Sequence, residues 1–80
     1  MTRTEADQKE KIHQNLMGKI FMRKGSGMKV KIIRIDVQND NGNESYDVFC
    51  TFTRTEPVTP LDSNHIIEQI DFFLGVYAPI

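Results

Sequence analysis

The stretch from Met28 to Val37, MKVKIIRIDV, constrains the fold most, because it combines β-branched residues with regular alternation. Side chains on a strand alternate between its two faces. Here the apolar side chains occupy even positions up to Ile32 and odd positions from Ile33 onward. A flat strand over one core would keep its phase, whereas a strand bent at a bulge, or running between the two sheets of a barrel, changes it. We therefore predict a central strand bent at this point, with Ile33 and Ile35 facing the core.

Two helices are predicted from capping signals and periodicity. Thr4 and Asp7 have the spacing of a capping box, which predicts a helix over about residues 5–17. Its apolar stripe is narrow, so it is expected to be a surface flap. Apolar residues recur at three- and four-residue spacing in 63–74 before Gly75, which predicts a second helix with one buried side.

The remaining segments read as strands and turns. Residues 19–24 and 45–54 alternate polar and apolar side chains and are predicted to be strands. The polar stretch 38–44 has the composition of a hairpin tip, and two prolines in 56–62 interrupt the strand pattern. Residues 76–80 alternate again, which predicts a short edge strand that closes a barrel.

The length of the chain limits what it can do. Eighty residues make one domain, here divided into a helical segment 1–18 and a barrel with its C-terminal helix in 19–80. The predicted class is α+β, a small antiparallel barrel of about five strands flanked by two helices. Such a domain has one thin core and no deep substrate cleft, so we expect a non-enzymatic module without a small-molecule substrate or cofactor.

The charges are segregated along the chain although the net charge is only −1. Residues 35–80 contain eight acidic residues and a single basic one, Arg54. Residues 19–34 contain six basic residues and no acid, namely Lys19, Arg23, Lys24, Lys29, Lys31 and Arg34. A basic patch of this kind can contact phosphate. The alternatives are that the two signs pair across the barrel, or that strand lysines protect against aggregation.

Residues with reactive side chains do not form a recognisable catalytic or metal-binding motif. His13 and His65 are far apart in sequence and have no third ligand at metal-site spacing, so they are expected to be surface residues. Cys50, the only cysteine, lies on the apolar side of its predicted strand and is expected to be a buried hydrophobe. The acids Asp62, Glu68 and Asp71 are expected on the solvated side of the second helix. No membrane-length apolar run or secretory leader is evident, so we expect a cytoplasmic protein.

The segment Lys24-Gly-Ser-Gly27-Met-Lys-Val-Lys-Ile-Ile-Arg-Ile-Asp36 places a glycine turn directly before an aliphatic strand. This segment, together with the order of the elements, resembles the SH3-like small β-barrels, which include the KOW and Tudor-type modules and short phage or bacterial domains. The resemblance implies contact with nucleic acid or the ribosome.

Two functions are therefore expected for a binding module. The first is a nucleic-acid contact through the six basic residues of 19–34. The alternative is a protein-binding or inhibitory module, such as a phage-encoded inhibitor, that uses the acidic surface and exposed apolar residues at Phe49 and Tyr77.

Overall fold

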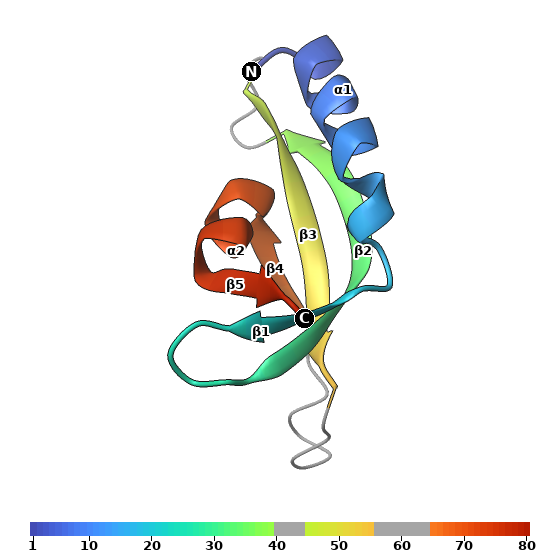
Figure 1. Cartoon of the computed structure of the whole chain (residues 1–80). Coiled ribbons are helices and arrows are strands. Elements are labelled where there is room, and N and C mark those ends of the chain that lie inside the picture. The colour runs from blue at the N-terminus through green and yellow to red at the C-terminus, as the bar shows by residue number, and fades with distance from the viewer. Residues whose placement is uncertain (40–44, 56–64) are drawn as a thin grey trace.

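The computed structural model describes residues 1–39, 45–55 and 65–80. In chain order the elements are α1 (Arg3–His13), the 3-10 helix η1 (Gln14–Leu16), β1 (Ile20–Arg23), β2 (Lys29–Asn39), β3 (Tyr46–Arg54), β4 (Ile66–Gln69), α2 (Ile70–Val76) and β5 (Tyr77–Pro79). All strand pairs are antiparallel and form one sheet in the order β4-β3-β2-β1-β5 (Figure 1). The α+β class, with five antiparallel strands, an N-terminal helix and a short C-terminal helix, is confirmed.

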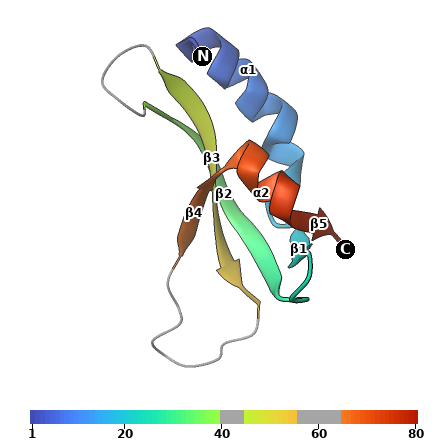
Figure 2. The ribbon, with the colours of Figure 1, turned by 90° about the vertical axis from the view of Figure 1, so that its left-hand side faces the viewer.

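The sheet is not closed, so the predicted barrel is wrong. The chain end does form an edge strand, and β5 pairs with β1 through Met22 and Ala78. The opposite edge is β4, and β4 and β5 do not pair with each other in the described part of the chain. The helix α2 contacts β3, β4 and β5 and covers the curled sheet between its two edges (Figure 2). A helix in this position buries the apolar inner face without edge-to-edge pairing.

The predicted bend of the central strand is confirmed in β2. Its pairing with β3 is regular up to Ile32, which lies opposite Phe52, and resumes at Arg34, which lies opposite Thr51. Ile33 is therefore the extra residue of a β-bulge. Beyond the bulge Ile35 faces the core and is 5% exposed, as predicted. Ile33 itself is half-buried and lies outside the core cluster, so its predicted core position is wrong.

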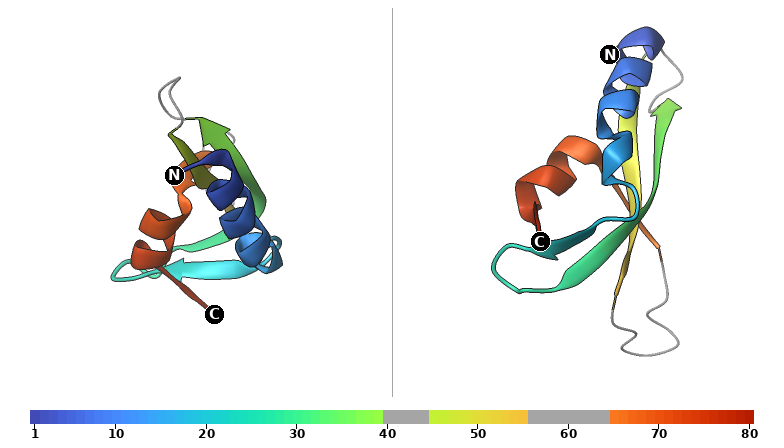
Figure 3. Two further views of the ribbon diagram at one scale, coloured as in Figure 1. Left: turned by 90° about the horizontal axis from the view of Figure 1, so that it is seen from above. Right: turned by 45° about the vertical axis from the view of Figure 1, so that its right-hand side comes forward.

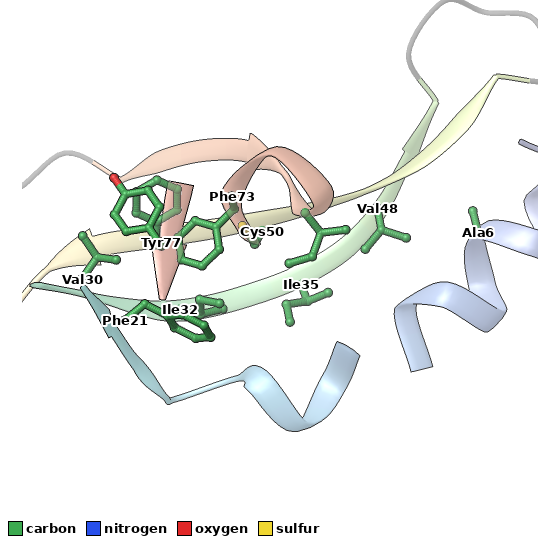
Figure 4. Close-up of a cluster of buried hydrophobic side chains, with 11 residues drawn as sticks. Ala6, Phe21, Val30, Ile32, Ile35, Val48, Cys50, Phe73 and Tyr77 are labelled. Atoms are coloured by element: carbon green, nitrogen blue, oxygen red, sulfur yellow. The ribbon is translucent and has the colours of Figure 1, made fainter. Parts of the chain in front are cut away.

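The core lies on the inner face of the curled sheet, beneath both helices (Figure 4). At its centre the Phe73 ring of α2 stacks on Tyr77 with ring centroids 4.4 Å apart, and it also contacts Phe21 and Phe52. Aromatic contacts of this kind add to the stabilisation from burial alone. The other fully or nearly fully buried members are Ala6, Val30, Ile32, Ile35, Val48, Cys50 and Ile70.

The N-terminal helix begins earlier than predicted and packs against the sheet. Its N-cap is Thr2, which forms a reciprocal capping box with Glu5, so the cap predicted at Thr4 is wrong. These hydrogen bonds lower the pKa of the Glu5 carboxyl. Ala6 is fully buried where α1 packs along β2 and β3 (Figure 3), whereas Ile12 remains 73% exposed. The helix is thus attached through Ala6 in its first turns, and Leu16 in the following η1 also packs against the core.

The segment predicted to be the second helix contains a strand followed by a shorter helix. Ile66–Gln69 form β4, which pairs with β3, and the helix begins only at Ile70. The helix extends through Gly75 to Val76, so Gly75 does not end it. The predicted hairpin tip at 38–44 lies mostly outside the described residues, apart from the end of β2. The predicted irregular segment 56–62 lies outside them entirely.

Candidate functional site

Two lysines of β2 stand on the outer face of the sheet. Lys29 and Lys31 lie opposite Met22 and Ile20 of β1, and all four side chains are exposed. The intervening residues Phe21, Val30 and Ile32 point inward and are buried. The alternation therefore presents cationic and apolar side chains together on one surface.

A shallow hollow of about 560 Å³ lies beside Lys29. It is formed by the ends of β1, β2 and β5 and combines two cations with an apolar lining. The backbone N–H of Ile80 donates to the carbonyl of Ile20 at 3.3 Å, which keeps the chain end against β1. The lining residues are Lys19, Ile20, Lys29, Pro79 and Ile80. We call Lys19, Lys29 and Lys31 the outer lysines.

The alternative, in which the basic segment pairs with the acidic half, is represented by one ion pair among the described residues. There only Arg34 of the six cations forms an ion pair, at 3.3 Å from Asp36 two positions along the same strand. The other ion pairs tie α1 internally and to α2, through Arg3 with Asp7 and Lys9 with Asp71. The outer lysines thus form no ion pair within the described ranges.

The other two basic residues lie towards the inner face. Arg23 lies opposite Tyr77 in the pairing of β1 with β5, on the side of the buried Phe21. Lys24 follows in the turn, where its Nζ donates to the carbonyl of Gly75 at 3.3 Å. The six predicted cations are consequently divided between two faces of the sheet and do not form a single patch.

A second hollow, of about 220 Å³, opens on the inner face between the ends of β1 and β3 and the helix α2. Its charged lining residues are Arg23, Arg54 and Glu68. Burial raises the pKa of the Tyr77 phenol at this hollow, and the positive charges of the two arginines act against the rise. The apolar lining comes from Met28, Phe52, Ile66, Phe72, Val76 and Tyr77. We call this hollow the inner pocket.

Phe49 and Tyr77, the two aromatic residues expected to bind a protein partner, do not form a common exposed surface. Tyr77 is only 7% exposed, so its predicted exposure is wrong, because its ring packs between Phe52 and Phe73. Phe49 is half-buried and lies opposite Asp36 in the pairing of β2 with β3. Among the described residues, the exposed aromatic side chain is instead Phe72, at 57%.

Cys50 is fully buried, and burial raises the pKa of its thiol to about 12. The thiolate is the reactive form, so a thiol reagent such as 5,5′-dithiobis(2-nitrobenzoic acid) at pH 8 should not modify the folded protein. After unfolding in urea, one thiol per chain should react rapidly. Rapid reaction of the native chain, measured by absorbance, would contradict the buried position.

The remaining candidate side chains are not assembled into a catalytic or metal site in the part of the chain described. The ring of His13 contacts the carbonyl of Lys9 through Nδ1 at 2.8 Å, and His65 is exposed at the start of β4. Glu68 is on a strand and Asp71 on a helix, so they do not share a helix side, while Asp62 lies outside the described residues. No group of three metal-ligating residues occurs among the residues described.

Within the described ranges, no helix is long and apolar enough to cross a membrane. Comparisons with protein-family models, with curated proteins and with solved structures found no match.

Sequence reasoning missed two residues of the inner pocket, Arg54 and Phe72. Arg54 is the isolated cation of an acidic half, and Phe72 precedes the core residue Phe73 in an apolar run. The pairing of β3 with β2 brings Arg54 close to Arg23, and the short helix α2 brings Phe72 to the same pocket. Only Arg54 could have been identified from the sequence, because it stands at the end of the alternating polar and apolar residues of its strand.

Proposed function

We propose that this domain is a non-enzymatic binding module that contacts the phosphate backbone of nucleic acid through the outer lysines. The observation that carries the proposal is that Lys19, Lys29 and Lys31 are exposed and form no ion pair with any described residue. Lysine side chains on such a surface neutralise phosphates and release condensed counterions. A relation to SH3-like modules is part of this proposal, and it rests on the glycine turn and strand at residues 24–36 and on the meander of strands.

The proposal predicts a steep dependence of affinity on salt. With about three phosphate contacts, a plot of log affinity against log salt concentration should have a slope of roughly −2 to −3. Lys31→Glu should weaken binding and flatten the slope without lowering thermal stability, because the side chain is exposed. Fluorescence anisotropy with labelled DNA and RNA measures both quantities.

Lys11→Glu is the matched control. Lys11 is an exposed lysine on α1, so the substitution changes the net charge equally but away from the outer lysines. Equal effects of Lys11→Glu and Lys31→Glu would show attraction by net charge without a defined face. Wild-type binding weaker than about 10⁻⁴ M at about 50 mM salt, the weak end of non-specific contacts, would overturn the proposal.

The second candidate function is a protein-binding or inhibitory module. It is favoured by the apolar residues exposed beside the outer lysines, namely Ile20 at 41%, Met22 at 40% and Ile80 at 71%. These side chains would supply apolar contact area to a protein partner, whereas phosphate does not need them. This function would be selected if the domain did not bind nucleic acid but bound a purified protein partner, and if Met22→Lys abolished that binding.

A further inference from the structure

We infer that the inner pocket receives one unpaired base of a single-stranded nucleic acid, stacked on Phe72, while Arg23 and Arg54 hold the adjoining phosphates. The inference rests on the proposed function and specifies which form of nucleic acid the domain prefers. It requires an accessible aromatic ring, cations at its side and room for one planar group.

The aromatic ring is available. Phe72 is 57% exposed, although it immediately precedes the fully buried Phe73. Its side chain lines the inner pocket together with Ile66 and Val76. An exposed aromatic ring beside cations is the arrangement by which proteins bind single strands, because every base has a stacking surface.

The size of the pocket indicates what enters it. Its volume of about 220 Å³ is below the roughly 300–1,000 Å³ typical of sites for whole small-molecule ligands. The pocket therefore suits one ring-sized group of a longer ligand. A base within a duplex is stacked and paired, so only an unpaired base can enter.

The charges around the pocket favour a ligand with repeated negative charge. Arg23 and Arg54 are exposed, line the pocket and form no ion pair with a described residue. The backbone N–H of Arg23 donates to the carbonyl of Met28 at 2.8 Å, which places Arg23 next to the start of β2 and hence to Lys29. Cations thus continue from the inner pocket around the end of the sheet to the outer lysines. A phosphate backbone matches this series, whereas a peptide would need several acidic residues in register.

Glu68 is the one acid among the described residues of the pocket lining, and its charge opposes phosphate. Glu68→Gln removes this repulsion and should strengthen single-strand binding. If the pocket instead held a cationic group of a protein, the same substitution would weaken binding, so a loss of affinity overturns the inference.

The main test compares single strands with duplexes by fluorescence anisotropy. The probe is a labelled single strand of about 12 nucleotides, within the range of known single-strand sites, and a hairpin duplex of equal charge serves as its comparison. Phe72→Ala should weaken single-strand binding about five- to a hundred-fold, the effect of losing one stacked base, and leave duplex binding unchanged. Phe72→Tyr should retain the affinity, whereas Phe72→Leu should not. Arg54→Gln should reduce the salt slope for the single strand by about 0.7.

A second measurement uses only the wild-type protein, so that it does not depend on the folding of a variant. A single strand of abasic nucleotides keeps the phosphates and lacks the bases. Its affinity for the wild type should be as low as the affinity of the normal strand for Phe72→Ala. Equal affinity for abasic and normal strands overturns the inference. The inference is also overturned if an acidic peptide that contains phenylalanine binds the wild type more tightly than the single strand does.

The two proposals fail in different ways. If Lys31→Glu weakens binding while Phe72→Ala and the abasic strand have no effect, the pocket assignment is wrong and the phosphate-binding function stands. If neither single strand nor duplex binds the wild type, both proposals are wrong.

Discussion

Phe73→Ala is expected to lower the free energy of unfolding by about 3–5 kcal/mol, the range for truncating a buried aromatic side chain. Phe73 is fully buried, and its ring centroid lies 5.1 Å from that of Phe21 and 4.8 Å from that of Phe52. Because Tyr77 stacks on its other side, the ring joins three strands, β1, β3 and β5, beneath α2. Small domains have a total stability of about 5–15 kcal/mol, so this one substitution removes a large share of it.

Phe72→Ala provides the matched control for this prediction. It is the same substitution one residue earlier on the same helix, at a side chain that is 57% exposed. Its cost should stay below about 1 kcal/mol, as for most surface positions. Urea unfolding followed by circular dichroism measures both variants. Similar losses at the two positions would show that Phe73 does not occupy the centre of the core.

Where one local pattern determined the structure, the sequence was sufficient to predict it. In β3 the alternation from Tyr46 to Phe52 matches the observed burial of Val48, Cys50 and Phe52, and the exception is Thr51, which is also buried. In β1 it separates the buried Phe21 from its exposed neighbours. Period-two alternation has this predictive power because one sheet face is covered and the other faces solvent.

Prediction failed where a short apolar run was compatible with two structures. Ile66 and Ile67 fit the helical spacing that ends at Leu74, but they are β-branched and belong to β4. Pairing of β4 with β3, from Phe49 to Phe52, outweighs the local pattern. Likewise the sheet stays open because α2 lies between β4 and β5, and this is a tertiary property that the spacing of residues 70–80 does not encode.

The candidate site was predicted only in part for the same reason. Lys29 and Lys31 follow from alternation along β2, and the structure places them together as that alternation implies. Lys19 precedes β1 in the phase of the inward Phe21, so alternation does not predict its place beside Lys29. The inner pocket required contact between the end of β3 and α2, which are separated by residues 55–69 in sequence. No spacing rule connects Arg54 with Phe72, so their approach is visible only in the folded chain.

The second large effect is expected in β2, where the same substitution should have different costs on either side of the bulge. Ile35→Ala should lower the free energy of unfolding by about 2–4 kcal/mol, because Ile35 is nearly fully buried and its removal leaves a cavity. Ile33→Ala should cost less than about 1 kcal/mol, because Ile33 is half-buried and outside the core cluster. Urea unfolding of the two variants measures the difference.

The reason for this asymmetry lies in the phase of the strand. If Ile33 is passed over, the inward residues Val30, Ile32, Ile35 and Val37 follow one another in strict alternation, which is the order that the pairing with β3 shows. The bulge thus lets a strand with a phase change in its sequence keep all of its core residues on one face while it bends. Equal costs at the two positions would mean that Ile33 also packs into the core. The phase change would then reflect a strand that passes between two cores, and the bulge would not explain it.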